Sequence, residues 1–513
     1  MNAPRLVRSG VTVGSWTMAS RVLGLVRDVI FAQLIGASAA ADAFFVAFKI
    51  PNFLRRLFAE GAFAQSFVPV LAATRAQEGE ASMQRLLNAV AARFGFILII
   101  VTAFGVMTAP WIAMVFAPGF ADNPAQLQLT GELLRWTFPY LGLVSLVAFS
   151  GSILNTVGRF SVPAATPIFL NLSLIAAAVW FAPLMDPSVR ALAIGVLIAG
   201  VIQLLIQIPP LLAAGCLPIP RWSETHPGVG KILTLMVPAL FGVSVSQINL
   251  LLDTVLASLL VSGSVSWLYY SDRLVELPLG VIAIAVSTVI LPALSRAFAQ
   301  SDAESARSTQ TWAIWVVMVL GWPCALALML FAEPILSTLF QYGAMQVHDV
   351  QQAAASLMAY AAGLPAFMAI KVLAPHYFAR QDTATPVRVG LIAMVANMAM
   401  NLMFVWSMGH VGLALATSLS AWLNAGLLLR GLSQRGWYRW TNIPWRPIAQ
   451  LSFGLAVMAQ CVWIAPTAES FIDLDVWERS IRLLVILSLA GLAYLAALWL
   501  GGVRYTRLFS PTP

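Results

Sequence analysis

The fold follows from the opening stretch VTVGSWTMASRVLGLVRDVIFAQLI, residues 11–35. One helical crossing of a lipid bilayer needs roughly 20 mostly apolar residues, and this stretch is long enough to make one. It contains two arginines and an aspartate, whereas the core of a cleavable signal peptide is short and apolar. We therefore expect the stretch to remain in the protein as its first membrane-spanning helix.

The composition extends this interpretation to the whole chain. Of the 513 residues, 60% are hydrophobic and 10% are charged, and the mean hydropathy is +0.85. An average soluble domain has about 25% charged residues, so a soluble globular enzyme is excluded. The three cysteines and four histidines are scattered without the spacing of a disulfide framework or a transition-metal site, and no cofactor is expected. The sequence predicts an all-α polytopic membrane protein.

Apolar runs separated by polar joints predict fourteen transmembrane helices. The second and the eighth contain Pro51 and Pro278. Because proline removes a backbone donor and kinks a helix, we expect both of these helices to be broken. The expected spans are 11–35, 42–71, 88–110, 130–155, 162–183, 190–213, 231–259, 265–294, 311–331, 350–374, 387–406, 411–430, 447–465 and 480–502.

The basic residues predict the orientation, because cytoplasmic loops carry an excess of Lys and Arg. Seventeen lie in joints on one side of the membrane, and only Arg190 and Arg479 lie in joints on the other. Both termini are therefore expected in the cytoplasm, and the net charge of +8 indicates topology rather than nucleic-acid binding. The seventeen are Arg5, Arg8, Arg75, Arg85, Arg159, Arg221, Lys231, Arg296, Arg307, Arg380, Arg388, Arg430, Arg435, Arg439, Arg446, Arg504 and Arg507.

Two ungapped matches of the chain to itself indicate an internal duplication. At an offset of 225, residues 27–45 lie over 252–270, and at an offset of 221, residues 142–159 lie over 363–380. Six spans precede the second copy, so the copies run parallel and are expected to be related by an axis along the membrane normal. The predicted architecture is two pseudo-symmetric six-helix lobes plus a C-terminal helix pair, with boundaries at 1–220, 221–440 and 441–513.

Charged residues inside apolar spans are the main candidates for function, because a cation at the centre of a membrane helix costs roughly 2.5 to 3.5 kcal/mol. Arginines outnumber acids in this set, which favours an anionic ligand. The planar guanidinium fork suits a phosphate or diphosphate better than a simple carboxylate. Salt bridges that only hold helices together are the alternative. The candidate residues are Arg21, Arg27, Asp28, Asp42, Arg55, Arg56, Glu60, Ser266, Arg273 and Glu276.

Four stretches resemble a known family. They are SWTMASRVLGLVRDVIFAQLIGA (15–37), ADAFFVAFKIPNFLRRLFAEGAFAQSFVPVL (41–71), SGSVSWLYYSDRLVELPLGV (262–281) and KVLAPHYFARQDTATPV (371–387). Through these motifs and its fourteen expected spans, essentially the whole sequence resembles the MurJ (MviN) family of lipid II flippases. The resemblance implies the fold of the multidrug/oligosaccharidyl-lipid/polysaccharide exporter superfamily.

The resemblance also implies a function. Members transport lipid II, the undecaprenyl-diphosphate-linked peptidoglycan precursor, from the cytoplasmic to the periplasmic leaflet of the bacterial inner membrane. Alternating access through a central cationic cavity is the expected mechanism, with a role in cell-wall biogenesis and cell shape. The positions that match functional positions of the family are Arg21, Arg27, Asp42, Arg55, Glu60, Ser266, Arg273 and Glu276.

The substrate's chemistry suggests how these parts are used. Arg21, Arg27 and Arg273 are the expected ligands of the diphosphate. The last two spans, almost free of charge, offer either a groove for the polyprenyl tail or ordinary packing on a lobe. Lipid II and membrane lipids are the expected partners, cell-wall synthesis proteins are further candidates, and the chain is expected to act as a monomer.

A second polar group is a candidate for coupling to an ion. Asp253 lies in the seventh span, Asn397 and Asn401 lie one turn apart in the eleventh, and Thr417 lies in the twelfth. Their oxygens suit a monovalent cation, although interhelical hydrogen bonds account for the same residues. A charged site also responds to the membrane potential, by about 2.3 kcal/mol per charge per 100 mV. No P-loop is present in the sequence, so ATP is not expected as the energy source.

The sequence also bears on three rival functions. A related exporter of another polyprenyl-linked oligosaccharide shares every feature described above. A multidrug or cation antiporter of the same superfamily should favour acidic residues, which the excess of arginine opposes. A membrane-embedded glycosyltransferase needs a catalytic acid on a large extracytoplasmic loop, and the longest such joints, 111–129 and 332–349, offer only Asp122, Glu333 and Asp349.

Overall fold

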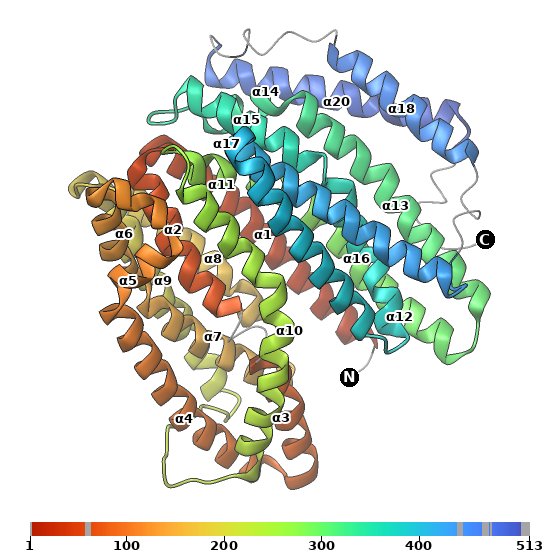
Figure 1. Cartoon of the computed structure of the whole chain (residues 1–513). Helices are drawn as coiled ribbons and strands as arrows, with labels where there is room; N and C mark the ends of the chain where they lie inside the picture. The colour runs from red at the N-terminus through yellow and green to blue at the C-terminus, as the bar shows by residue number, and fades with distance from the viewer. Residues whose placement is uncertain (1–2, 57–62, 439–444, 464–470, 472–473, 504–513) are drawn as a thin grey trace. The chain divides into compact units, whose positions relative to one another are not determined.

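The chain is helical throughout the computed structural model, which describes residues 3–56, 63–438, 445–463, 471 and 474–503 (Figure 1). No strand occurs among these residues. Two of the short elements, η3 and η5, are π-helical turns, and η2 and η4 are 3-10 turns. In order, the elements are α1 (Ala3–Ile35), α2 (Ala39–Leu54), α3 (Ala64–Glu78), α4 (Glu80–Met107), α5 (Ala109–Phe116), η2 (Pro118–Asp122), α6 (Pro124–Thr137), α7 (Pro139–Thr156), α8 (Ser161–Ala176), η3 (Ala177–Phe181), η4 (Ala182–Leu184), α9 (Val189–Leu212), α10 (Pro227–Ser258), α11 (Ser264–Pro278), η5 (Leu279–Ala283), α12 (Ile284–Ala299), α13 (Ala303–Leu330), α14 (Ala332–Phe340), α15 (Val347–Ala361), α16 (Leu364–Ala379), α17 (Ala384–Gln434), α18 (Trp445–Trp463) and α20 (Val476–Leu500).

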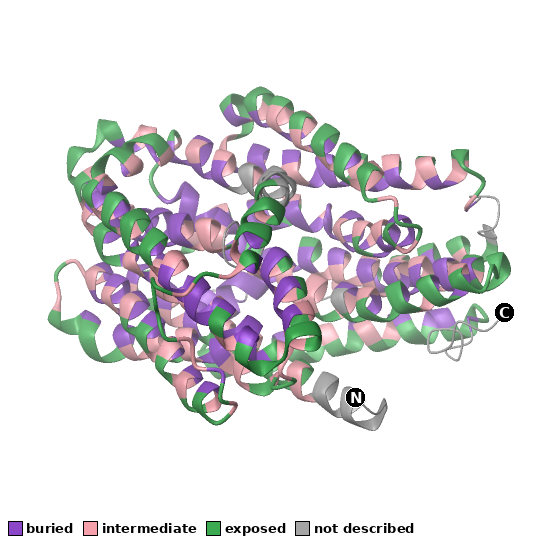
Figure 2. Cartoon of the chain, turned by 90° about the horizontal axis from the view of Figure 1, so that it is seen from below, coloured by how far each residue is buried: buried purple, intermediate pink, exposed green. Residues whose placement is uncertain are grey.

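The helices have the length and surface of membrane spans. Nine helical segments within the described ranges are long and apolar enough to cross a bilayer. Met107, Trp111, Met403 and Trp406 are at least 70% exposed, and exposed apolar surface of this kind is rare on soluble monomers. Figure 2 shows exposed residues (green) and buried residues (purple) on the same helices. The expected class of helical membrane protein is confirmed, whereas the count of fourteen crossings remains a prediction.

The chain forms two compact units, residues 1–266 and 267–513. In the first unit, α1 packs on α8, both α7 and α8 pack on α9, and α2 packs on α6. Phe67 of α3, Leu87 of α4 and Phe149 of α7 belong to one buried apolar cluster. The two units are groups of residues in contact, whereas the lobes are expected from the internal repeat of the sequence. The boundaries of the lobes remain a prediction.

In the second unit, α16 packs on α12, α13 and α17. The C-terminal helices α18 and α20 pack on each other and on α13. The Tyr494 hydroxyl of α20 donates to the Val319 carbonyl of α13 at 2.6 Å, and both residues share an apolar cluster with Leu451 of α18. These contacts hold the pair on α13, and a groove for the polyprenyl tail remains a prediction.

The two expected proline breaks differ. α11 ends at Pro278 and passes through the π-helical turn η5 into α12, so the α-helical geometry is interrupted there within one continuous helical segment. By contrast, α2 continues through Pro51 to Leu54. Pro51 cannot donate to the Ala47 carbonyl, and the Thr137 hydroxyl donates to that oxygen instead, at 2.9 Å. The expected span 42–71 nevertheless comprises two helices, α2 and α3, and within α2 the Thr137 hydroxyl compensates for the hydrogen bond that Pro51 cannot make.

The eleventh and twelfth expected spans are the two arms of α17. Gly409, between them, has φ 56° and ψ −136°, a conformation that a residue with a Cβ atom rarely adopts. The Asn397 side chain on the first arm donates to the Thr417 hydroxyl on the second, at 3.5 Å. The arms therefore fold back on each other at a glycine, within a segment that is apolar on both sides.

Candidate functional site

Helix α1 carries a buried ion pair. Arg27 Nη2 lies 2.6 Å and Nε 2.9 Å from Asp28 Oδ1, and the two side chains are 3% and 2% exposed. The Phe31 ring centroid lies 5.5 Å from the Arg27 Cζ. Arg21, on the same helix, is half-buried. In this conformation the charge of Arg27 is neutralised by its own helix, as in the salt-bridge alternative raised from the sequence.

Asn171 of α8 completes the arrangement around Arg27. Its Oδ1 accepts from Arg27 Nη1 at 3.0 Å, and its Nδ2 donates to the Ser20 carbonyl of α1 at 2.9 Å. The amide therefore orients the guanidinium and joins α8 to α1. Asn171 was not among the candidates from the sequence, although an amide within an otherwise apolar span marks its position.

Asp42 binds the turn that leads into α11. Its Oδ1 accepts from the Ser266 N–H at 2.9 Å and from the Ser266 hydroxyl at 2.5 Å, and its Oδ2 accepts from the Gly263 N–H at 2.6 Å. Gly263 has a φ of +99°, and a carboxylate beside a helix N-terminus is favoured by the helix dipole. Asp42 and Ser266 were separate candidates in the sequence, and the structure brings them together.

The end of α2 carries two more candidate cations. Arg55 Nε donates to Asn52 Oδ1 at 3.3 Å, and Asn52 Nδ2 donates to the Phe48 carbonyl at 2.9 Å. Arg56 is exposed, and Glu60 lies outside the described residues. Asn52 therefore links Arg55 to the backbone of α2.

Helix α11 carries the second arginine–carboxylate pair of the predicted site. Arg273 Nη1 lies 2.8 Å from Glu276 Oε2, and the two side chains are 34% and 41% exposed. The Tyr269 ring centroid lies 5.4 Å from the Arg273 Cζ. The one-turn spacing places these three side chains on one face of the helix, where the aromatic ring and the carboxylate orient a half-exposed guanidinium.

The residues of the expected cation site are hydrogen-bonded where the structure gives their contacts. Asn401 Nδ2 donates to Asn397 Oδ1 at 3.1 Å, and the Thr417 hydroxyl, which accepts from Asn397, donates to the Leu413 carbonyl at 3.0 Å. Asn397 and Asn401 are buried. Asp253 is half-buried on α10, in the first unit. The three residues of α17 are brought together, and their contacts match the hydrogen-bond alternative.

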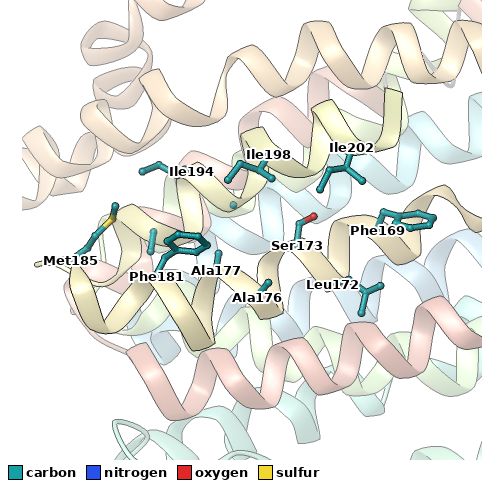
Figure 3. Close-up of a pocket in the computed structure, with 12 residues that line it drawn as sticks. Phe169, Leu172, Ser173, Ala176, Ala177, Phe181, Met185, Ile194, Ile198 and Ile202 are labelled. Carbon is teal, nitrogen blue, oxygen red and sulfur yellow. The ribbon is translucent and has the colours of Figure 1, made fainter. Parts of the chain in front are cut away.

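A cavity of about 290 Å³ lies apart from these charged residues, between α8 and α9 (Figure 3). Phe169, Leu172, Phe181, Ile198 and Ile202 are among its lining residues, and none of the predicted site residues lines it. Its lining is almost entirely apolar, so it cannot bind a diphosphate.

Comparison with known proteins identifies the family. A family model described as lipid II flippase MurJ matches residues 31–475. The chain belongs to the MurJ family of lipid II flippases. It is 48% identical over 516 residues to the probable lipid II flippase MurJ of Vibrio cholerae, covering 99% of this chain and 98% of that protein. It is 38% identical over 506 residues to the lipid II flippase MurJ of Burkholderia cenocepacia, covering 98% of each.

Solved structures agree with the family. A lipid II flippase MurJ in an inward closed conformation matches with a TM-score of 0.81 and 26% identity, covering 98% of this chain and 100% of that chain. An inward-facing MATE transporter of the MOP superfamily matches with a TM-score of 0.69 and 14% identity, covering 83% of this chain and 97% of that chain, which shows the shared fold alone. The MurJ resemblance seen in the sequence is confirmed, and the protein is a multi-pass membrane transporter rather than an enzyme.

Proposed function

We propose that this chain moves lipid II from the cytoplasmic to the periplasmic leaflet of the bacterial inner membrane by alternating access. Lipid II carries a diphosphate and a sugar-peptide head on a polyprenyl tail, so its transporter must shield the head while the tail stays in lipid. The proposal places both termini in the cytoplasm and has two six-helix lobes and a C-terminal pair acting in one monomer. Contacts with cell-wall synthesis proteins belong to the same proposal.

The observation that carries the proposal is the set of arginine–carboxylate pairs on α1 and α11 in a chain of the MurJ family. Charged groups within membrane helices are expensive and mark substrate pathways. A guanidinium forms two parallel hydrogen bonds with phosphate oxygens, as it does with a carboxylate.

We assign the diphosphate to Arg21, Arg27 and Arg273. The Asp28 and Glu276 carboxylates pair with two of these arginines in the structure. A diphosphate brings its own negative charge, so it can replace a carboxylate as the partner of a guanidinium. Binding of the head group is then an exchange of one anionic partner for another, and it leaves no cation unpaired.

The function is tested by depleting the protein from its host cell and measuring in which leaflet lipid II accumulates. The proposal predicts accumulation in the cytoplasmic leaflet, with recovery on expression of the intact chain. Accumulation in the periplasmic leaflet, or an unchanged distribution, would contradict it. Expression of Arg296→Ala is the control and should restore the distribution of lipid II as the intact chain does. Arg296 is exposed on α12 and donates to the Pro292 carbonyl of its own helix.

We further propose that Asp253, Asn397, Asn401 and Thr417 make the chain responsive to a monovalent cation or to the membrane potential. Carboxylate, amide and hydroxyl oxygens are the donors that hard cations prefer, so the residue types fit. Occupation of the α17 residues by an ion requires their hydrogen bonds to be exchanged for ion–oxygen contacts. The proposal predicts that sodium raises the unfolding temperature of the purified chain, and that Asn401→Ala abolishes this increase. An equal response of the wild type and Asn401→Ala would return these residues to a packing role.

A further inference from the structure

Three aromatic rings and two guanidinium groups of the second unit pack together in one aromatic–arginine stack, which consists of Phe298, Arg380, Trp437, Arg435 and Tyr377. The Arg380 Cζ lies 4.2 Å from the centroid of the Phe298 ring and 4.3 Å from that of Trp437. The Arg435 Cζ lies 4.8 Å from the Trp437 centroid and 5.6 Å from that of Tyr377. The Arg380 guanidinium therefore contacts two rings, and the Arg435 guanidinium lies beside Trp437 and Tyr377, whose ring centroids are 5.9 Å apart; all four are favourable cation–π contacts.

The stack forms where three helices of the second unit end. Phe298 belongs to the last turn of α12, Arg380 is the C-cap of α16, and Trp437 follows the end of α17. These helices pack on one another, and Figure 1 shows α12 and α16 side by side. The sequence assigns both arginines to the predicted cytoplasmic side of the membrane, so the stack is expected at the level of the lipid head groups.

A buried histidine supports the two rings that enclose Arg380. The His376 ring lies 5.1 Å from the Phe298 centroid and 6.0 Å from the Trp437 centroid, and its Nδ1 lies 3.2 Å from Gln310 Oε1. His376 itself is 1% exposed. The two rings are therefore fixed by packing, and the slot between them is preorganised.

The two arginines of the stack differ in their charge partners. Arg435 pairs with Asp382 and donates to the Thr385 hydroxyl at 2.8 Å. Within the described ranges, Arg380 has ring contacts but no ion-pair partner, and burial lowers its pKa. Taken over the whole residue, Arg380 is nevertheless exposed. Because its Cζ lies over both the Phe298 and the Trp437 ring, the guanidinium is held by ring contacts, and its N–H groups are left for another partner.

We propose that Arg380 is a phosphate-binding site, which takes the phosphate of an anionic lipid head group or a free phosphate ion. A guanidinium donates to phosphate oxygens through its N–H groups, which the ring contacts leave for such a partner. Because the rings already hold the group in place, binding loses little side-chain freedom. Basic pockets at the cytoplasmic level of membrane proteins bind anionic head groups. This site is separate from the residues assigned to lipid II and does not depend on that assignment.

The test compares Arg380→Gln with Arg296→Gln in the purified full chain. Arg296 is exposed near the end of the same helix as Phe298, and its removal deletes the same charge without touching the stack. Affinity is measured in nanodiscs of phosphatidylcholine with increasing phosphatidylglycerol, and separately in neutral detergent with inorganic phosphate. We expect Arg380→Gln to weaken binding roughly tenfold, the loss expected for one hydrogen-bonded charged contact, and Arg296→Gln to bind as the wild type does.

The two measurements also identify the source of the phosphate. A loss confined to phosphatidylglycerol supports a lipid site, and a loss confined to inorganic phosphate supports a site for the free ion. Equal affinity of wild type and Arg380→Gln for both, or an equal loss in Arg296→Gln, would overturn the proposal. If Arg380→Gln does not fold, Arg380→Lys keeps the charge but loses the planar fork, and wild-type affinity in that variant would overturn it as well.

Discussion

The arginine–carboxylate pairs of α1 and α11 join the same chemical groups in different surroundings. The Arg27 and Asp28 side chains are 3% and 2% exposed, whereas those of Arg273 and Glu276 are 34% and 41% exposed. Arg27 has a second protein partner in Asn171, and Arg273 has the Tyr269 ring. The buried pair is enclosed by protein, and the exposed pair presents its cation to its surroundings.

Because the two pairs differ in burial, we expect them to contribute differently to the stability of the protein. Removing one partner of a buried pair leaves an uncompensated charge, at a cost of about 3 to 5 kcal/mol. An exposed pair contributes roughly 0 to 1 kcal/mol, because solvent screens it. We therefore expect the loss of one partner to impair folding in the α1 pair and to leave folding intact in the α11 pair, while Arg27 and Arg273 both remain assigned to the diphosphate.

The largest expected effect separates the two pairs directly. Asp28→Ala leaves Arg27 buried without its carboxylate, so we expect the free energy of unfolding to fall by about 3 to 5 kcal/mol. Glu276→Ala should lower it by less than about 1 kcal/mol. Denaturant unfolding of the purified proteins measures both changes, and membrane abundance should follow the same order.

A double variant checks that the cause is the stranded charge. Replacing the pair by Arg27→Leu and Asp28→Leu removes both charges, and apolar replacements of buried pairs are often neutral or stabilising. This variant should be more stable than Asp28→Ala alone. Equal effects of Asp28→Ala and Glu276→Ala would show that burial does not distinguish the pairs.

A smaller effect is expected at Asp42, which is buried like Asp28 but accepts from neutral groups. Asp42→Ala leaves the donors of Gly263 and Ser266 without an acceptor, and we expect a loss of about 1 to 3 kcal/mol. Ser266→Ala removes only the hydroxyl bond, so its loss should be about 0.5 to 1.5 kcal/mol. Thermal unfolding in detergent ranks the two variants, and a larger loss in Ser266→Ala would contradict the assignment of Asp42 as the shared acceptor.

The smallest effect concerns a partly exposed pair outside the membrane spans. The Arg435 guanidinium and Thr385 hydrogen bonds lower the pKa of Asp382 to about 2, from an ordinary value of about 3.9. A lowered carboxyl pKa stabilises the protein above the ordinary value, and this contribution is lost as the pH falls through the folded-state pKa. Stability measured against pH should therefore show an Asp382 contribution that is constant from pH 7 to about 5 and declines from about 4 to 2. In Asp382→Asn this decline should be absent, and a variant that keeps it would show that other carboxyl groups cause it.

Much of the helical architecture could be predicted from the sequence, because apolar periods and membrane thickness are local constraints. The turn between the two arms of α17 falls at Gly409, in the expected joint between two spans. The passage of α2 through Pro51 could not be predicted, since it depends on a hydrogen bond from Thr137, which is distant in sequence. Local rules locate a proline, but tertiary contacts decide whether the helix breaks there.

The candidate site was predictable in its residue types and less so in its pairings. Charged residues in apolar spans identified Arg27, Asp28 and Asp42 before any contact was known. Their partners Asn171 and Ser266 lie on other helices, and single-sequence patterns carry no information about such distances. The salt-bridge and ligand-binding interpretations also could not be separated, because burial distinguishes them and burial is a property of the folded chain.

The most direct measurement is lipid II translocation in proteoliposomes that contain equal amounts of correctly folded wild-type, Arg273→Ala or Arg273→Lys protein. Arg273 contacts Glu276 and Tyr269 within its own helix and is half-buried, so its variants should fold. We expect translocation by the wild type, none by Arg273→Ala, and partial activity in Arg273→Lys, which keeps the charge but loses the bidentate fork. Wild-type rates in Arg273→Ala, together with unchanged lipid II binding, would contradict the assignment of this arginine to the diphosphate.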